Sequence, residues 1–265
     1  MADAFFLPRG DGYLPTELTR GPWDPEAQHG GPPAALLGRA VERAGRAGMQ
    51  VTRMTFEILR PVPIAPLEVA TRVVRGGRSV ELVEASLSAA GVEVMRAVAL
   101  RIRESEVALP EGLGRDVPLP GPAHGRALPF FPTGQEVGYH TAMEWSFLDG
   151  AFLETGPATV WLRMRHPLLP DEPPSPLCRV LIAADSANGV GATLDYRRYV
   201  FINPDLTVYL HRAPVGEWVC LVARATAEPT GVGLAECVVH DERGPVARGL
   251  QSLLVNRRRA APHRR

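Results

Sequence analysis

The chain has 265 residues, of which 45% are hydrophobic and 22% charged, which is ordinary for a folded globular protein. Its 29 basic residues balance 29 acidic ones, so we expect no strong attraction to nucleic acid or to an anionic membrane. Every basic residue is arginine. The absence of lysine excludes P-loop, kinase and lysine-aldolase chemistries, which need that side chain.

The cysteines favour a reducing compartment. Cys178, Cys220 and Cys237 are odd in number and have no CxxC spacing, so neither a disulfide framework nor a zinc ribbon is expected. The apolar run of residues 4–7 is too short for a signal peptide, and no stretch is long enough to span a membrane. We therefore expect a cytoplasmic protein without a membrane partner.

In chain order, the first half predicts one helix followed by strands. The helix opens at Pro32 and Pro33, which suit a first turn, carries an apolar stripe, and ends at Gly45. Strands are expected at residues 17–20, 51–60, 67–74, 79–90 and 92–103. Residues 105–135 follow; they contain six prolines and no strand or helix period, which is typical of an interdomain connection.

The second half predicts a similar order. A helix is expected from about Asp185 to Tyr196, after a proline-rich loop at residues 166–176. Strands are expected at residues 142–148, 158–165, 200–212, 217–228, 233–241 and 245–255. A helix followed by antiparallel strands, twice, predicts the α+β class with each helix packed on a sheet.

An internal repeat supports this division. Residues 53–60 (RMTFEILR) align with residues 205–212 (DLTVYLHR) at an offset of 152, which places Thr55 on Thr207. Upstream, HGGPPAALLGRAVER (29–43) aligns with ADSANGVGATLDY (184–196). We therefore predict tandem units at residues 1–104 and 136–257, joined by the linker 105–135 and followed by a basic tail at 258–265.

Polar residues that only one copy carries are candidates for chemistry. At the same offset Asn203 replaces Val51, Gln251 replaces Ala99, and Asp205 replaces Arg53, while Asp185 stands where the first copy has GGPP. Each has a structural alternative. Asp185 could cap a helix, Asn203 could belong to a turn, and Gln251 could be an exposed strand residue.

These landmarks resemble the bacterial acyl-CoA thioesterase II family, whose members are double hotdogs. The resemblance is carried by HGGPPAALLGRAVER in the first half and, in the second, by AAD (183–185), FINPDLTVYLHR (201–212) and GLQSLLVNR (249–257). It implies an acyl-CoA substrate and a water activated by an aspartate at a helix start, a hydroxyl residue and a glutamine. Carried over by position, the aspartate is Asp185 and the glutamine Gln251, whereas Asn203 occupies the hydroxyl position.

The implied chemistry needs a base, a held water and donors for an oxyanion. Asp185 would be the base, Asn203 and Gln251 would hold the water, and the amides of Gly30, Gly31 or Gly189 could polarise the carbonyl. Asp205 would orient Asn203 or pair with Arg212. No cofactor or metal is implied, and the histidines lack metal-ligand spacing.

Other functions remain open. A serine hydrolase is disfavoured because no GxSxG occurs. A hotdog hydratase would place an aspartate two residues before Asn203-Pro204, where Phe201 stands, and a histidine at Leu206. A non-catalytic acyl-thioester-binding protein is the main alternative.

We expect one continuous sheet with the helices of residues 32–44 and 186–196 on its concave side, which removes two exposed sheet edges. The resemblance also implies a homo-oligomer. The tail, residues 256–265, is expected to be disordered and dispensable, although its arginines could touch phosphates of the substrate.

Overall fold

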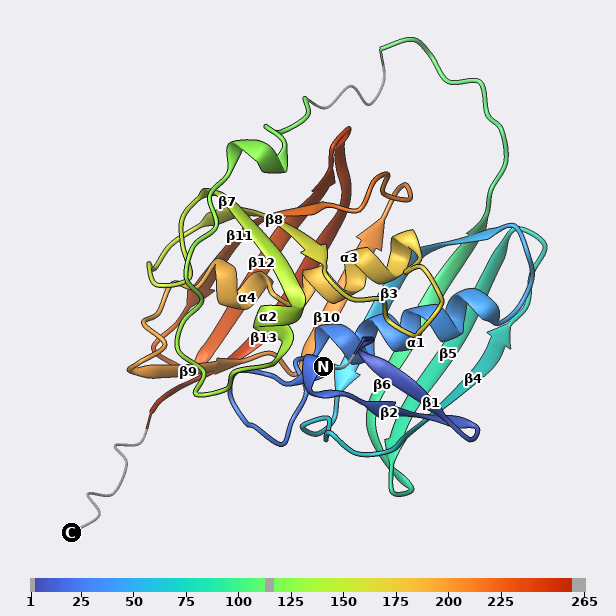
Figure 1. Cartoon of the computed structure of the whole chain (residues 1–265). Helices are drawn as coiled ribbons and strands as arrows, with labels where there is room; N and C mark the ends of the chain where they lie inside the picture. Colours follow the sequence, from blue (N-terminus) through green and yellow to red (C-terminus); the bar gives the residue numbers. More distant parts are fainter. Residues whose placement is uncertain (1–2, 113–116, 259–265) are drawn as a thin grey trace.

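The computed structural model describes residues 3–112 and 117–258. In this part of the chain, the strands form a single 13-stranded sheet in the order β1-β2-β4-β5-β6-β3-β10-β13-β12-β11-β8-β7, with β9 paired to β13. Neighbouring strands are antiparallel throughout. The sheet therefore runs without interruption through both halves of the chain, as expected (Figure 1).

The two halves contain matching elements. The first half comprises β1 (Phe6–Arg9), β2 (Gly12–Pro15), η1 (Glu17–Thr19), α1 (Gly31–Arg43), β3 (Met49–Ile58), β4 (Leu67–Arg75), β5 (Val80–Ala89) and β6 (Val92–Arg103). The second comprises η2 (Pro122–His124), α2 (Tyr139–Ala142), β7 (Met143–Asp149), β8 (Ala158–Met164), α3 (Pro176–Ala184), α4 (Ala187–Val190), β9 (Tyr199–Ile202), β10 (Asp205–Leu210), β11 (Val219–Ala227), β12 (Val232–Asp241) and β13 (Gly244–Arg257).

The sheet order is the same from either edge, which confirms the doubled architecture. β3 and β10 meet in the middle, where Thr55 lies opposite Thr207 with 3.3 Å between their hydroxyl oxygens. These two threonines are the pair that the 152-residue offset aligned. The two copies are thus related by an approximate twofold axis that passes between them.

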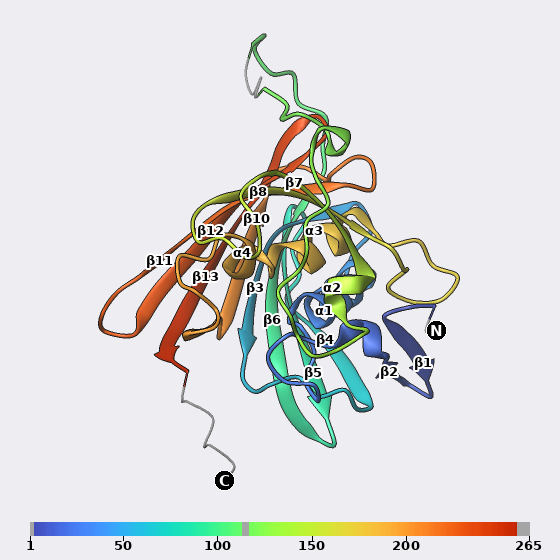
Figure 2. The ribbon, with the colours of Figure 1, turned by 60° about the vertical axis from the view of Figure 1, so that its left-hand side comes forward.

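The helices cover one face of the sheet. α1 and α3 lie side by side against the concave face, and the second view shows the sheet curving around them (Figures 1 and 2). They approach closely, because a Cβ on Gly38 of α1 would stand 2.4 Å from Cδ1 of Leu181. The apolar core between helices and sheet includes Leu36, Leu37 and Val41 of α1. No helix of the described residues is long and apolar enough to cross a membrane.

The second long helix differs from the prediction. α3 begins at Pro176, the last residue of the predicted loop, because the Ser175 hydroxyl caps it by accepting from the Cys178 amide. It ends before Asp185, which is its C-cap, and only the short α4 lies within the predicted 186–196 helix. The alignment of residues 29–43 with 184–196 was therefore wrong, and Asp185 does not cap a helix start.

Two strand predictions were also wrong. Residues 17–19 form a 3₁₀ turn, not a strand, and the Thr16 hydroxyl caps it. The hairpin β1–β2 that precedes it was not predicted. The predicted strand 200–212 is split at Asn203-Pro204. Ile202 pairs with Leu254 of β13, and Thr207 pairs with Leu250. The chain therefore advances five residues on this side and only four on β13. This mismatch is a β-bulge, a feature that redirects a side chain.

The C-terminal prediction was partly wrong. Asn256 and Arg257 belong to β13 and pair with Val200 and Tyr199 of β9. The Arg258 side chain donates to the Tyr196 carbonyl at 2.6 Å and lies over the ring of Trp23. The predicted disorder of residues 259–265 lies outside the described residues.

Candidate active site

The structure brings three predicted site residues together around one carboxylate. Oδ1 of Asp185 accepts from Nδ2 of Asn203 at 2.8 Å and from Nε2 of Gln251 at 3.3 Å. Asp185 is 4% exposed and Gln251 1%. A buried carboxylate requires such donors, since an unpaired charge out of water is costly. The three side chains thus form one buried hydrogen-bonded group.

Two strands and a helix end position this group. Gln251 lies on the inner face of β13, and Asn203 occupies the bulge between β9 and β10. Asn188 of α4 closes the network, because its amide donates to Oε1 of Gln251 at 3.2 Å and its side chain donates to Oδ1 of Asn203 at 3.2 Å. Asn188 was missed from the sequence, where it sat inside a predicted helix without a visible partner.

The first copy contributes a histidine to the site. Nδ1 of His29 lies 3.0 Å from Oδ2 of Asp185, so the site spans both units. The His29 ring stacks on Tyr139 at 3.8 Å between centroids. The Tyr139 hydroxyl donates to the Ile182 carbonyl at 2.7 Å and lies 2.9 Å from the Ser186 hydroxyl. His29 could not be assigned a role from the HGGPP motif, because no sequence spacing relates it to Asp185.

Burial controls the protonation of His29. Burial lowers the pKa of His29 below its ordinary value, and the Asp185 charge opposes this shift only in part. The ring is therefore neutral at neutral pH. Nδ1 either carries the proton and donates to Asp185, or is bare and accepts from the Gly31 amide at 3.1 Å. These two arrangements exclude one another, because they correspond to the two tautomers of the neutral ring.

Two glycines at the start of α1, Gly30 and Gly31, pack closely against the end of α3. A Cβ on Gly30 would lie 2.8 Å from Oδ2 of Asp185, and one on Gly31 would lie 2.4 Å from the Ile182 carbonyl oxygen. Only glycine therefore fits this contact between α1 and α3. The Gly30 amide makes no hydrogen bond to any described residue, and it lies at the positive end of the α1 dipole. It can serve a bound oxyanion.

Two predicted site residues lie differently. The Gly189 amide already donates to the Ser186 carbonyl at 3.0 Å, so it has no free donor for a substrate. The Asp205 carboxylate accepts from the Ser252 amide at 2.7 Å, and Arg212 pairs with Asp241 instead. Asp205 touches Asn203 only through its backbone carbonyl, at 3.2 Å. The predicted Asp205–Arg212 pair was wrong, because the Asp205 side chain is bonded to the backbone of the neighbouring strand β13.

A doubled helix-on-sheet unit of this order is the double hotdog fold, the architecture of a class of thioesterases. A family model of the acyl-CoA thioesterase N-terminal domain matches residues 19–102, and one of the acyl-CoA thioesterase C-terminal domain matches residues 122–255. The chain therefore belongs to the acyl-CoA thioesterase family.

Solved structures agree on the fold. A protein provisionally named thioesterase II from Thermobifida fusca is 19% identical, with a TM-score of 0.77 and 95% of each chain covered. A hot dog protein of unknown function from Alicyclobacillus acidocaldarius is 18% identical, with a TM-score of 0.72 and 98% of each chain covered. An acyl-CoA thioesterase II from Mycobacterium marinum is 17% identical, with a TM-score of 0.67 and 94% of each chain covered. A comparison with curated protein sequences gives no match.

Proposed function

We propose that the chain hydrolyses acyl-CoA thioesters with a water activated at Asp185. The observation that carries this proposal is the convergence of Asn203, Gln251 and His29 on the Asp185 carboxylate. The water oxygen attacks the thioester carbonyl carbon while Asp185 takes the water's proton. The tetrahedral intermediate then collapses, the carbon–sulfur bond breaks, and the thiolate takes up the proton, which leaves a free acid and the thiol.

Each neighbour of Asp185 has a part in this reaction. Asn203 and Gln251 fix the carboxylate through their amide NH2 groups, and each amide oxygen keeps a second acceptor site that can hold a water. His29, neutral at neutral pH, donates from Nδ1 to Asp185 when Nδ1 carries the proton and then helps to hold the carboxylate in place. The Gly30 amide at the positive end of α1 stabilises the oxyanion, the kind of interaction that contributes most when donors are held in place.

Asparagine at position 203 deserves a specific role, because the family resemblance places a hydroxyl there. Its side chain has both a donor, used on Asp185 at 2.8 Å, and an acceptor, used on Asn188 at 3.2 Å. A threonine hydroxyl has its donor and acceptors on one oxygen, whereas the asparagine amide carries them on two separate atoms. We propose that the amide supports the same water-holding task and adds a link to α4.

The test is thiol release from a panel of short, medium, long and aromatic acyl-CoAs. We expect turnover of at least one ester by the wild-type protein. Binding without release would favour the alternative, an acyl-thioester-binding protein. A parallel panel of acyl carrier protein thioesters identifies the carrier, and we propose that it is coenzyme A.

We also propose a homo-oligomer in the cytoplasm. Leu234, Leu250 and Leu254 are exposed on neighbouring strands β12 and β13, which supports a subunit contact there. Three free, buried cysteines support a reducing compartment. A solution mass of 28.7 kDa, that of one chain, would contradict the oligomer.

The unit boundaries 1–104 and 136–257, with a linker at 105–135, are likewise a proposal. The two matched family regions, 19–102 and 122–255, support it, although the second begins inside the linker. Limited proteolysis at residues 104–112, which are exposed, is expected to separate the chain without cutting either unit.

A further inference from the structure

A cavity of about 540 Å³ lies beside the candidate active site. Gly189, which follows Asn188, and Phe201, which lies two residues before Asn203, both line it. Two residues of extended strand span about 7 Å, so the cavity begins within one acyl group's reach of the site. A Cβ on Gly189 would meet nothing within 4 Å, which shows that this wall faces open space.

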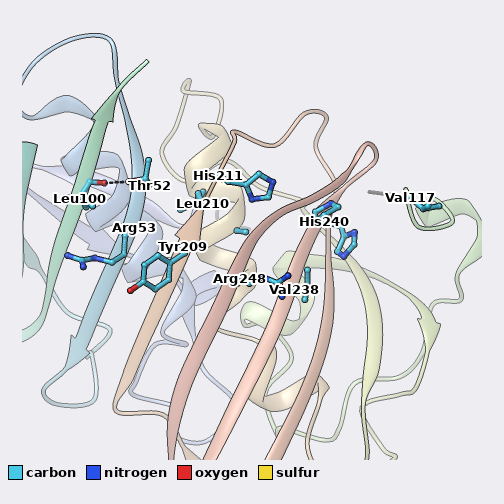
Figure 3. A pocket seen from close by; sticks show the side chains of 12 residues that line it. Thr52, Arg53, Leu100, Val117, Tyr209, Leu210, His211, Val238, His240 and Arg248 are labelled. Atoms are coloured by element: carbon cyan, nitrogen blue, oxygen red, sulfur yellow. Dashed lines mark hydrogen bonds between the residues drawn. The ribbon is translucent and has the colours of Figure 1, made fainter. Parts of the chain in front are cut away.

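Another cavity, of about 640 Å³, lies elsewhere. It lies on the outer face of the sheet, where Tyr209 of β10 stands between Arg53 of β3 and Arg248 of β13 (Figure 3). Neither cavity is lined by a member of the Asp185 group, but of the two only the smaller is lined by residues within two positions of its members, Gly189 and Phe201. The smaller cavity is therefore the better candidate for the substrate's acyl group.

The buried side of the smaller cavity is aromatic. Phe131, Phe152 and Phe201 line it and are 7%, 6% and 4% exposed, respectively. Tyr196 also lines it and lies 4.8 Å from Phe131 between ring centroids. Glu154 and Arg197 line the cavity as exposed residues, so they mark its solvent side. The inner end thus offers ring faces and edges, while Asp195, which is half-buried, also lines the cavity.

The linker supplies part of this wall. Phe131 belongs to the predicted linker, yet it stacks on Trp23 of the first unit at 5.6 Å and contacts Phe152 of the second. Its neighbour Phe130 packs into the same cluster, 4.3 Å from Phe152, but does not line the cavity. Of these two adjacent phenylalanines, Phe131 therefore contacts the cavity and Phe130 does not.

We infer that this cavity holds the acyl group of the substrate, that it favours acyl groups carrying an aromatic ring, and that Phe131 is a specificity-determining residue. The inference rests on the proposed thioester hydrolysis. Aromatic rings prefer offset or edge contacts with other rings and gain from them beyond what burial alone provides. An aryl-bearing acyl group can make such contacts with Phe131, Phe152 and Phe201 where a straight chain cannot.

The experiment compares two esters of equal carbon number, 3-phenylpropanoyl-CoA and nonanoyl-CoA, by the ratio of their kcat/KM values. We expect the wild-type ratio to exceed one. In Phe131→Ala and in Phe131→Leu, which keeps most of the apolar volume, the ratio falls about two- to tenfold. In the matched control Phe130→Ala it stays at the wild-type value. Because each ratio is internal to one protein, a uniform loss of folded enzyme cancels.

Four outcomes would count against the inference. It is overturned by a wild-type ratio below one, by a ratio that the two Phe131 variants leave unchanged, or by a ratio that Phe130→Ala lowers equally. In these three cases thiol release by the wild type still supports hydrolysis. If the wild type releases no thiol from any ester of the panel, the proposed function fails and the inference falls with it.

Discussion

The two ends of the helix pair have the same architecture and different chemistry. At one end the start of α1 meets the end of α3, where His29 and Gly30 contact Asp185. At the other, the start of α3 meets the end of α1, where the Ser175 hydroxyl lies 2.6 Å from Oε2 of Glu42. The approximate twofold axis relates the two ends, so each places a carboxylate next to a helix start.

The two ends differ in the side chains that the sheet presents to each carboxylate. Under Asp185 the strands present Asn203 and Gln251, whereas the corresponding positions under Glu42 are Val51 and Ala99, which are 6% and 0% exposed. Burial raises the pKa of Glu42, and the Ser175 hydroxyl opposes this only in part. As a whole residue Glu42 is nevertheless exposed, and among the described residues its carboxylate has no amide donor from the sheet, whereas Asp185 is buried and accepts from two.

At the Glu42 end, buried polar groups of the first copy serve the structure. Arg101 on β6 is 2% exposed and donates to Oε2 of Glu81 at 2.8 Å and to the Arg46 carbonyl at 2.9 Å. It also donates to the Ala44 carbonyl at the end of α1. This buried pair fixes the turn after α1. The two copies of a duplicated fold thus differ in their polar groups: one end gathers buried side chains around Asp185, and the other fastens the end of a helix.

The largest expected effect is that of Asp185→Asn. Removing the base should lower kcat by about 10²- to 10⁴-fold, the usual contribution of a general base. The variant should fold, because the amide still accepts from Asn203 and approximates the shape of the carboxylate. Thiol-release kinetics measure kcat, and near-ultraviolet circular dichroism checks the fold. Full activity in a folded variant would exclude Asp185 as the base.

Gln251→Ala makes the second copy like the first at this position. It removes two contacts to Asp185 and the acceptor for the Asn188 amide, and we expect kcat to fall about 100-fold. Ser252→Ala is the matched control, because the Ser252 side chain is on the outer face and the backbone amide of residue 252 still donates its hydrogen bond to Asp205. If both variants lost the same activity, the loss would reflect strand damage, not chemistry.

The pH profile tests the contribution of the first copy. Because burial lowers the pKa of His29 below 6.5, the neutral ring persists as pH falls through 6.5 and protonates only below it. We expect kcat/KM to stay level through pH 6.5 and then to decline. His29→Gln should remove this limb and lower kcat/KM about tenfold. A limb above pH 6.5, or one that His29→Gln leaves in place, would contradict this role.

The smallest effects concern the fold. Gly31→Ala should lower the free energy of unfolding by about 1–3 kcal/mol, because its Cβ would stand 2.4 Å from the Ile182 carbonyl. Gly189→Ala, whose Cβ meets nothing, should change it by less than about 0.5 kcal/mol. Urea unfolding measures both. Equal effects would show that the α1–α3 contact is not as tight as described.

The strands after each helix were predictable from the sequence, because apolar alternation and the 152-residue offset are local patterns. β4 and β11 begin at Leu67 and Val219, at that offset. Asn203 and Gln251 stood out because they replace apolar residues at the 152-residue offset, whereas Asp185 was found through the family resemblance and was aligned wrongly within the repeat. The second helix was not, because Ser175-Pro176 ended a proline-rich stretch typical of a loop. His29 and Asn188 were not predicted because their roles depend on packing between distant segments.

The most direct test compares the two carboxylates, one at each end of the helix pair, in a single assay. Thiol release from the best acyl-CoA of the panel is measured for the wild type, Asp185→Asn and Glu42→Gln, each checked for folding. We predict that Glu42→Gln keeps kcat within about twofold of the wild type, while Asp185→Asn loses about 100-fold or more. If the Glu42 variant lost the activity and the Asp185 variant kept it, the active site would lie at the other end and the account would be wrong.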